Sequence, residues 1–275
     1  MDFNLALILV LLTVVSGIFV AYNHFVYSKN LQQGGDPSKG LDVAIEYSRS
    51  FFPVLLIVLV IRSFIFEPFR IPSGSMMPTL VQGDFIFVKK FQYGLRLPVT
   101  ETKIIETGSP ERGDVVVFRL PQNPSVNYIK RVIGLPGDEI IYKDRRLSIN
   151  GELVSVDASS RFEMRDQDLY MDGTLIMNDI DPQSPGTRFD AYSEVLGERR
   201  HDILLEQQLG SSRVGRYRVP EGHYFMMGDN RDNSKDSRFI DAIPETHLVG
   251  EAVLIWMHMD GLEWPNWGRI GTRIQ

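Results

Sequence analysis

The stretch NYIKRVIG, residues 127–134, alternates its side chains in the manner of a β-strand. In an extended strand Tyr128 and Lys130 lie on one face, while Ile129 and Arg131 lie on the other. Similar short runs, rich in β-branched and aromatic residues, occur on either side of it and are separated by Gly, Pro and Asp. These runs are DFIFVKK, DVVVF, YFMMG and EAVLIWM. The chain is therefore predicted to be mainly β, with an antiparallel β-sheet at its centre.

The segment LSINGELV contains the clearest hairpin signal. Asn150 and Gly151 both tolerate positive φ, which a type I′ turn between two alternating strands requires. The region around it, residues 144–213, is more polar and acidic than its flanks and includes the turn-rich run DPQSPGT. We therefore predict an inserted smaller β-rich subdomain over 144–213, between core segments 67–143 and 214–275.

The composition is that of a folded protein, since 43% of the 275 residues are hydrophobic and 23% are charged. A formal net charge of −6 argues against nucleic acid as a partner, because phosphate neutralisation needs a basic surface. The chain has no cysteine, which excludes disulfides, thiolate metal sites and a cysteine nucleophile. Its five histidines show no metal-binding spacing, so we expect neither a metal site nor a cofactor.

Two apolar stretches fit membrane-spanning helices, Phe3–Tyr22 and Ser50–Phe66. The first carries no charge, and the second contains only Arg62, near its end, where a long side chain reaches the interface. We predict transmembrane helices within residues 1–22 and 50–66. The alternatives are a cleaved signal peptide for the first stretch and a buried or in-plane helix for the second.

The polar segment between these stretches, residues 23–49, contains Lys29, Lys39 and Arg49, whereas no basic residue precedes the first stretch. The positive-inside rule therefore predicts that this segment is a cytoplasmic loop. Two crossings then place the N-terminus and everything after Phe66 on the opposite side of the membrane.

The stretch PSGSMMPTL, residues 72–80, follows the second apolar segment closely. Pro72 and Pro78 restrict the backbone, and Gly74 allows another molecule to approach it. Without a histidine base or a metal, a serine can still act as a nucleophile if a neutral lysine takes its proton.

Lys130 is the lysine best placed to be uncharged, because it lies within a strand beside aromatic and β-branched residues. Burial there would lower its pKa, and a decrease of about three units would cost roughly 4 kcal/mol of stability. The alternative is an ordinary strand lysine whose stem packs on the sheet while its amine lies in solvent. The pattern alone leaves both interpretations open.

The loop GDNRDNSKDSR, residues 228–238, is dense in opposite charges and short polar side chains. It lacks the glycine at the sixth position that a calcium-binding loop needs, and Arg231 and Lys235 would lie among the ligands. We interpret it as a loop that holds neighbouring strands through charge-assisted hydrogen bonds.

Four motifs follow the two apolar segments in an order that closely resembles bacterial signal peptidase I: PSGSMMPTL, RGDVVVF, YIKRVIGLPGD and GDNRDNSKDSR. The resemblance covers Phe69–Asp138 and the segment from Gly222 to about Ile255. The segment between them resembles the variable second domain of the Gram-negative enzymes only weakly. The resemblance implies a membrane-anchored serine endopeptidase with a Ser-Lys dyad, in the two-anchor Gram-negative form. A disulfide found in some relatives cannot exist here, because the chain has no cysteine.

The resemblance also implies roles for single residues. Ser75 matches the family's nucleophile, and Lys130 matches its general base. Ser73 matches a hydroxyl that, with the backbone N–H of Ser75, forms the oxyanion hole. Ser234 matches the hydroxyl that orients the lysine side chain.

Further residues match bracing and substrate-binding positions of the family. Asp229 with Arg131, and Asp236 with Arg238, match ion pairs that brace the site. The residues that align with two shallow apolar pockets are Phe69, Ile71, Ile86, Val117 and Ile129 for the deeper pocket, and Met76, Leu80 and Tyr128 for the other. These apolar residues fit an ordinary core equally well.

By the same resemblance, the substrates are exported preproteins that carry signal peptides, bound as an added strand and cut after sites of the Ala-x-Ala type. The implied location is the bacterial inner membrane, crossed more than once, with the catalytic domain on the periplasmic side. The phospholipid bilayer is then a partner, and the Sec translocation machinery is a further candidate. Two other interpretations remain: a self-cleaving Ser-Lys regulator of the repressor type, and a non-catalytic anchored β-domain that scaffolds export machinery.

Overall fold

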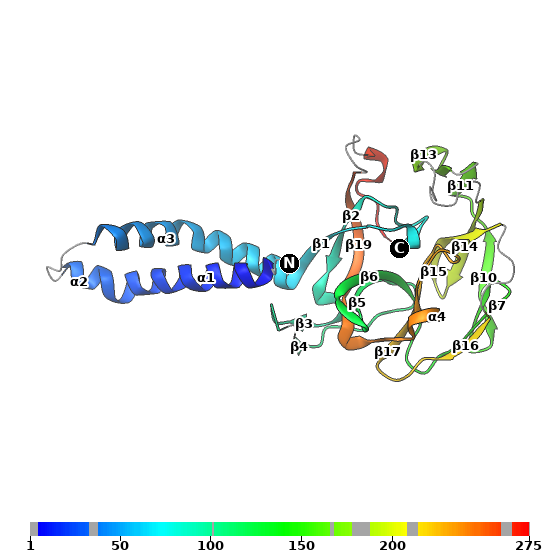
Figure 1. Cartoon of the computed structure of the whole chain (residues 1–275), viewed down its shortest axis with the longest axis horizontal. Coiled ribbons are helices and arrows are strands. Elements are labelled where there is room, and N and C mark those ends of the chain that lie inside the picture. Colours follow the sequence, from blue (N-terminus) through cyan, green and yellow to red (C-terminus); the bar gives the residue numbers. More distant parts are fainter. Residues whose placement is uncertain are drawn as a thin grey trace. The chain divides into compact units, whose positions relative to one another are not determined.

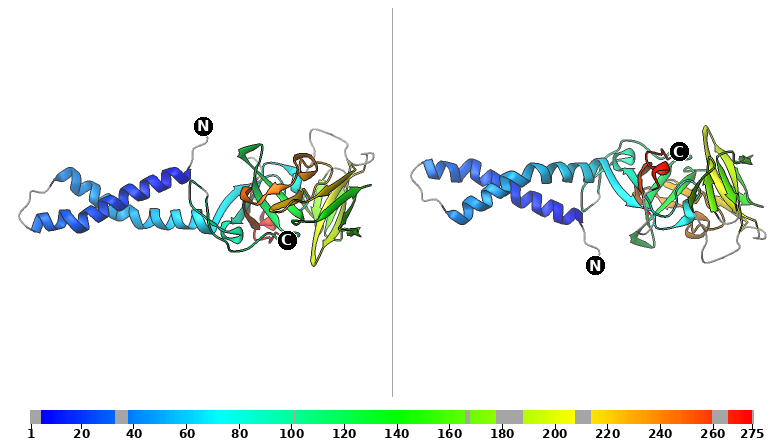
Figure 2. Two further views of the ribbon diagram at one scale, coloured as in Figure 1. Left: turned by 90° about the horizontal axis from the view of Figure 1, so that it is seen from below. Right: turned by 90° about the horizontal axis from the view of Figure 1, so that it is seen from above.

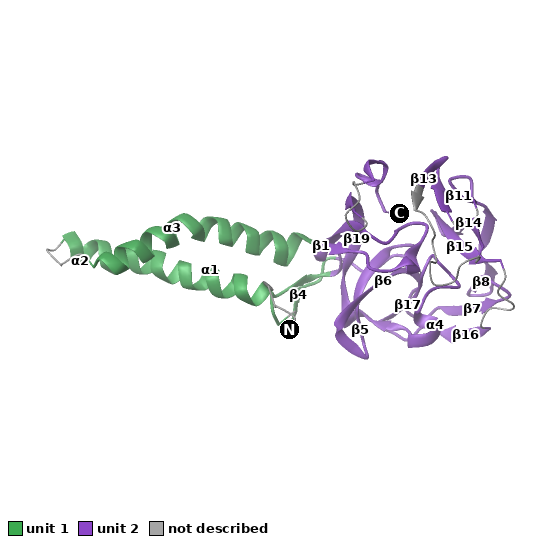
Figure 3. Cartoon of the chain, turned by 45° about the horizontal axis from the view of Figure 1, so that its top comes forward, with its two compact units in different colours: residues 1–67, 94–107 green, residues 68–93, 108–275 purple. Residues whose placement is uncertain are grey.

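The chain, in a computed structural model, divides into two compact units, which Figure 3 colours separately. One unit comprises Met1–Glu67 with Gly94–Thr107, and the other comprises Pro68–Tyr93 with Gly108–Gln275. The structure describes residues 5–32, 38–100, 102–165, 168–177, 188–207, 214–259 and 266–274.

The first unit is dominated by two long helical stretches that lie side by side (Figure 2). Helix α1 (Leu5–Tyr22) continues through a π-helical turn, Asn23–Tyr27, into α2 (Ser28–Gln32). Helix α3 (Lys39–Val60) continues through a second π-helical turn, Ile61–Ile65.

Both helical stretches are long and apolar enough to cross a membrane. Ala6–Gln32 and Lys39–Ile65 each have 27 residues and contain a strongly apolar window of 18 residues. At about 1.5 Å per residue each exceeds the thickness of a bilayer core. Tyr27 connects the two helical stretches at their polar ends through hydrogen bonds. Its hydroxyl donates to Asp42 at 2.7 Å and accepts from the backbone N–H of Ser38 at 3.0 Å.

The segment expected to be a loop, residues 23–49, is largely helical in the structure. This segment contains α2 and the first turns of α3. Both helical stretches therefore extend beyond their uncharged parts into the polar segment. The same unit includes a short hairpin of β3 (Leu95–Arg96) and β4 (Lys103–Ile105). The boundaries of membrane, loop and core segments given from the sequence stay a prediction.

The second unit is built on a seven-stranded sheet with the order β1-β2-β19-β5-β6-β17-β18 (Figure 1). The pairs from β2 to β18 are antiparallel. The strands are β1 (Phe66–Arg70), β2 (Asp84–Lys89), β5 (Val115–Leu120), β6 (Asn123–Gly134), β17 (His223–Met227), β18 (Ile243–Pro244) and β19 (Leu248–His258). Strand β19 lies between β2 and β5, although it comes from the end of the chain. The mainly antiparallel β fold expected from the alternating runs is confirmed.

Three smaller sheets complete this unit. One has the order β16-β7-β8-β9, and the others have the orders β10-β14-β15 and β11-β12-β13. The strands are β7 (Glu139–Lys143), β8 (Arg146–Ile149), β9 (Glu152–Leu153), β10 (Ser155–Ala158), β11 (Phe162–Arg165), β12 (Asp168–Met171), β13 (Thr174–Met177), β14 (Phe189–Leu196), β15 (Arg199–Glu206) and β16 (Gly215–Arg218). The inserted region is thus rich in β-strands, as expected, and the run DPQSPGT lies outside the described residues.

Short helical turns connect the strands at several points. They are α4 (Ser237–Ile240) and the 3₁₀ turns Gly74–Met76, Lys90–Tyr93, Glu245–His247 and Trp267–Arg269.

The hairpin predicted at Asn150 and Gly151 is present between β8 and β9. Both residues have positive φ, 52° and 86°, as a type I′ turn requires. A second two-residue hairpin, between β7 and β8, turns at Asp144 and Arg145, also with positive φ. This turn was not predicted, because neither of its residues is the glycine that usually marks one.

The core of the second unit lies on both sides of the seven-stranded sheet. One cluster includes Ile86, Val117 and Ile255, and another includes Phe118 and Val132. A separate cluster joins Met77 and Val81, which follow the Gly74–Met76 turn, to Phe162, Phe189 and Leu204 of the inserted region. Apolar packing therefore attaches the inserted strands to the turn that contains Ser75.

Candidate active site

The turn that carries Ser75 is fixed from two sides. Met76 is fully buried in the sheet's core, whereas Ser75 is only half-buried. On the other side, Asn230 donates its backbone N–H to the Ser75 carbonyl and its side-chain Nδ2 to the Gly74 carbonyl, each at 3.2 Å. The backbone of Ser75 is therefore held in place while its hydroxyl stays partly accessible.

Lys130 extends from β6 to this turn. Its Nζ donates to Ser75 Oγ at 2.6 Å and to the carbonyl of Ile129 at 2.8 Å. The amine lies 5.5 Å from the centre of the Tyr128 ring, and the residue as a whole is only 4% exposed. The structure therefore brings the expected nucleophile and base into direct contact, at a position with little water.

Burial lowers the pKa of Lys130 to about 8, although the nearby carboxylates of Asp236 and Asp229 act in the opposite direction. The cause is the loss of hydration, which disfavours the ammonium form. At mildly alkaline pH a large share of the molecules would carry a neutral amine beside the Ser75 hydroxyl. Such an amine can accept a proton from that hydroxyl.

Ser73 and Ser234 lie on different sides of the nucleophile. Ser73 directly precedes the turn in extended conformation, with φ −143° and ψ 156°, and is exposed. Ser234 Oγ is buried and, among the residues that the structure describes, has no hydrogen-bond partner. The expected hydrogen bond between Ser234 and Lys130 is thus not formed here, and both serine roles stay predictions.

Gly228 allows the loop after β17 to approach the nucleophile closely. A Cβ atom at this position would lie 2.3 Å from Ser234 Oγ and 2.4 Å from the Ser75 carbonyl oxygen. Both distances are far below van der Waals contact, and one of them is to backbone that cannot move aside. A side chain at residue 228 would therefore separate the loop from the turn.

The two expected ion pairs are both present and buried. Arg131 makes two parallel hydrogen bonds to Asp229, at 2.8 and 2.7 Å, and Arg238 makes two to Asp236, each at 2.8 Å. Thr79 adds a hydrogen bond to Asp229 at 2.6 Å. Burial alone would raise the pKa of Asp229, but Arg131 outweighs it and the pKa is lowered, so the carboxylate stays charged.

The apolar residues expected to line substrate pockets pack mostly within one core. Ile71, Met76, Leu80, Ile86, Val117 and Ile129 are buried in the same cluster, with Phe69 against it. Tyr128 packs against the neighbouring cluster on the other side of the sheet. Their position next to Ser75 and Lys130 suits substrate contact, yet the same packing serves the core, so the pocket assignment stays a prediction.

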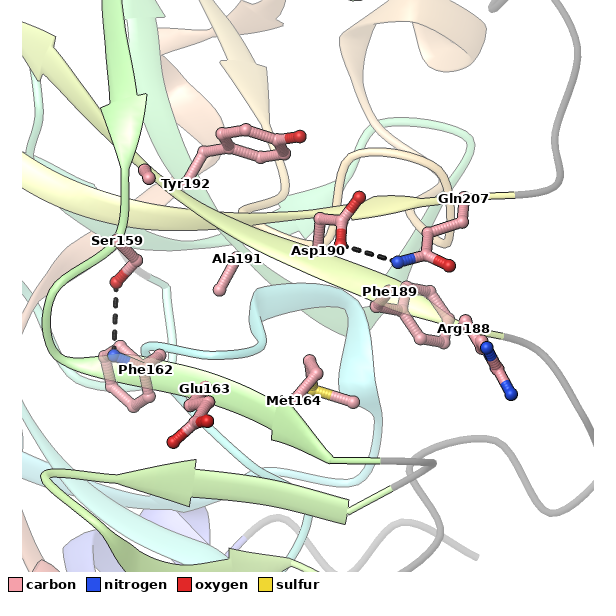
Figure 4. Close-up of a pocket in the computed structure, with 11 residues that line it drawn as sticks. Ser159, Phe162, Glu163, Met164, Arg188, Phe189, Asp190, Ala191, Tyr192 and Gln207 are labelled. Atoms are coloured by element: carbon pink, nitrogen blue, oxygen red, sulfur yellow. Dashed lines mark hydrogen bonds between the residues drawn. The ribbon is translucent and has the colours of Figure 1, made fainter.

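The inserted region contains a separate cavity of about 500 Å³ (Figure 4). It is lined by β11 and β14, with Met164 and Phe189 on its apolar side. Asp190 and Gln207 are joined there by a hydrogen bond of 2.6 Å. No residue of the expected site lines this cavity.

Several buried polar residues near the site were not expected from the sequence. Glu194 on β14 binds Arg231 in the loop at residues 228–238, and His201 on β15 lies beside them. All three are at most 4% exposed. Charged residues in a polar, acidic segment are normally solvated, so no local signal distinguishes these. Across the described ranges, no group of three His, Asp or Glu side chains is arranged to hold a metal ion.

Comparisons with known proteins identify the family of the chain. Residues 44–257 match the family model "Signal peptidase, peptidase S26". A signal peptidase I of Pseudomonas fluorescens is 47% identical over 242 residues, covering 82% of this chain and 78% of its own. The signal peptidase I of Pseudomonas aeruginosa is 45% identical over 249 residues, covering 83% and 78%.

A solved signal peptidase I from Enterococcus faecalis is 26% identical and covers 52% of this chain and 96% of its own, with a TM-score of 0.24. The sequence matches span both the Ser75 turn and the loop at residues 228–238. The chain belongs to the signal peptidase I family, peptidase family S26.

Proposed function

We propose that this signal peptidase I cleaves its substrates with a dyad of Ser75 and Lys130. The observation that carries the proposal is the 2.6 Å contact between Lys130 Nζ and Ser75 Oγ at a buried position. A neutral amine accepts the Ser75 proton while Oγ attacks the carbonyl carbon of the scissile bond. The ammonium so formed returns this proton to the leaving amine, and the mature protein departs with a free N-terminus.

The remaining acyl-enzyme is hydrolysed by the same groups. The neutral Lys130 amine now takes a proton from water, whose oxygen attacks the ester carbonyl of Ser75. The proton returns to Ser75 Oγ as the ester bond breaks, and the signal peptide leaves with a carboxylate. In both steps the negative oxygen of the tetrahedral intermediate accepts hydrogen bonds from the Ser73 hydroxyl and the Ser75 N–H, as proposed from the family resemblance.

The proposed substrates are exported preproteins with small residues at the first and third positions before the cut. Ser75 follows β1, an edge strand of the seven-stranded sheet, by only a few residues. A substrate in extended conformation can bind there by strand addition, which leaves alternate side chains directed at the apolar residues around the dyad. Small side chains fit because these apolar residues are already closely packed.

Two apolar helices and the kinship with Gram-negative enzymes indicate anchoring in the inner membrane. We propose that both helices cross it, with the catalytic unit on the periplasmic side. Lys29, Lys39 and Arg49 between the apolar runs support a cytoplasmic position for their connection. The bilayer, and the Sec machinery that delivers preproteins, are the proposed partners.

The test is cleavage of a purified preprotein with an Ala-x-Ala site by the full chain in detergent micelles. The wild type should release a product whose new N-terminus, read by mass spectrometry, follows that site, and Ser75→Ala should release none. Ser125→Ala, which removes an exposed hydroxyl at the start of β6, is the matched control and should behave as wild type. Cleavage by Ser75→Ala at the wild-type rate would contradict the proposal, and cleavage of the enzyme alone would favour a self-cleaving regulator.

A further inference from the structure

The inserted region contributes a buried carboxylate to the loop that holds the nucleophile. Glu194 accepts two hydrogen bonds from Arg231, one from Nη1 at 2.8 Å and a very short one from Nη2. Both side chains are 1% exposed. This pair joins β14 to the loop after β17, two segments that are far apart in the sequence.

Strand β15 forms backbone hydrogen bonds with the same loop. The Leu204 N–H donates to the Asp229 carbonyl at 2.9 Å, and the Arg231 N–H donates to the Leu204 carbonyl at 3.1 Å. Between these two contacts lies Asn230, whose hydrogen bonds hold Gly74 and Ser75. Contacts therefore run without a break from the inserted strands, through residues 229–231, to the backbone of the nucleophile.

Apart from Lys130, whose charge depends on pH, the charges in this region balance only when Glu194 of the inserted region is counted. Arg131 and Arg231 carry two positive charges, and Asp229 and Glu194 carry two negative charges, all at most 1% exposed. The pair of Asp236 and Arg238 is balanced by itself. Without Glu194 the cluster would hold one excess positive charge away from water, which is costly because a buried ion needs a partner.

His201 lies inside this cluster and does not disturb the balance. It is the direct cross-strand neighbour of Glu194, and its Nε2 lies 3.3 Å from that carboxylate and 3.9 Å from Asp229. Burial and the charge of Arg131 lower the pKa of His201, against the two carboxylates. The ring is therefore neutral at pH 7 and separates the two carboxylates that flank it.

We propose that Glu194 is a positioning residue for peptide cleavage: by neutralising Arg231 it holds residues 229–231 against β15, and through Asn230 it fixes the Ser75 turn. The inserted region is then part of the active-site support and not an independent module. This inference rests on the proposed role of Ser75 as nucleophile.

The test compares kcat and KM of the full chain in detergent micelles, per folded molecule. Glu194→Gln keeps the shape and removes the charge, so kcat should fall by about 10- to 100-fold through loss of alignment, while KM changes little. Glu163→Gln is the matched control, since it removes the same charge from the same inserted region in an exposed pair with Arg165. The control should keep the wild-type kcat.

A double variant tests whether the loss of activity comes from the unpaired charge or from the altered side chains themselves. Arg231→Met alone leaves Glu194 as an unpaired buried charge, so this variant should also turn over more slowly than wild type. The double variant, Glu194→Gln with Arg231→Met, has no unpaired charge and should turn over faster than either single variant. Amide hydrogen exchange over residues 228–236 should rise in the single variants and recover in the double variant. If Glu194→Gln fails to fold, Glu194→Asp keeps the charge one methylene shorter and should still lower kcat.

Two results would overturn the inference. One is a wild-type kcat per folded molecule in Glu194→Gln or, where that variant does not fold, in Glu194→Asp. The other is a double variant as slow as the product of the two single effects. Either result with an inactive Ser75→Ala would reject only the role of Glu194. An active Ser75→Ala would reject the proposed nucleophile itself.

Discussion

Lys130 Nζ and Ser75 Oγ lie 2.6 Å apart, although the two residues belong to β6 and to the turn after β1. Lys130 is only 4% exposed, whereas Ser75 is half-buried and its hydroxyl is partly accessible. The chemistry of this contact depends on the protonation of the amine, which the surrounding burial controls.

Activity should rise with pH until the amine is deprotonated. With a Lys130 pKa of about 8, kcat/KM should increase roughly tenfold per pH unit below that value and level off above it. Initial rates of preprotein cleavage, measured from mildly acidic to alkaline pH, would show this rise and plateau of kcat/KM. A profile that is flat over the whole range would exclude Lys130 as the base.

Replacement of Lys130 should stabilise the fold while abolishing cleavage. A pKa of about 8 in the folded chain, against 10.5 as the ordinary value, means that burial of the charged amine costs about 3 kcal/mol at any pH below 8. The cost shrinks as pH rises from 8 towards 10.5, where the folded chain releases the proton first. Lys130→Met should therefore unfold at a higher temperature than wild type at pH 7, with a smaller gain at pH 10.

Lys130→Arg is the companion variant, because guanidinium does not give up its proton under these conditions. It should be inactive without the gain in stability. A Lys130→Met protein that is less stable than wild type at pH 7 would show that contacts of the amine outweigh its desolvation.

Ser73→Ala should lower the rate more than it lowers binding. An oxyanion donor acts on charge that develops only in the transition state, so its loss should reduce kcat by about 100-fold with little change in KM. Steady-state kinetics on the preprotein would separate the two constants. Because Ser73 is exposed, the melting temperature should not change, and turnover equal to wild type would remove Ser73 from the oxyanion hole.

Ser234→Ala distinguishes a catalytic hydroxyl from a structural one. The hydroxyl is buried without a hydrogen-bond partner among the described residues, so removing it should keep or slightly raise the melting temperature. If it orients Lys130 during the reaction, kcat should fall and the acid limb of the pH profile should shift. Unchanged kinetics in a stable variant would contradict that role.

Asp229→Asn should destabilise the catalytic unit strongly. It removes the negative charge that balances Arg131, which is fully buried, and leaves one acceptor oxygen for the two donors of that arginine. Such a change costs about 3 to 5 kcal/mol. Asp157→Asn breaks an ion pair with Arg200 whose side chains are more than half exposed, so it should change stability by less than about 1 kcal/mol. Thermal unfolding of the two variants side by side checks the contrast, and equal effects would contradict it.

The family, the class of enzyme and the mainly antiparallel β fold were predictable from the sequence and are confirmed. Alternation in residues 127–134 identified β6, and Asn150 with Gly151 identified a hairpin, because both signals are local. The two apolar segments were visible for the same reason. The start of α3 at Lys39 was not, since its first turns carry charge and continue the apolar helix only in the folded chain.

The support of the site could not be derived from the sequence alone. Glu194, His201 and Arg231 are charged or polar residues whose burial depends on the meeting of distant strands. Gly228 is one glycine among many, and only the close approach of the Ser75 carbonyl explains it. Lys130 itself was ambiguous, because a strand lysine is ordinarily solvated, and it took the family resemblance to favour the buried alternative.

Strand β19 lies between β2 and β5, yet it is synthesised after both of them. During translation β2 and β5 are therefore made before the strand that pairs with both of them. Until then the sheet on which the loop at residues 228–238 packs is incomplete. The nucleophile and base are made early, but a nascent chain shorter than about 258 residues has two open sheet edges, which are prone to pair with other chains. We therefore expect no peptide cleavage by a chain in which β19 has not yet paired with β2 and β5.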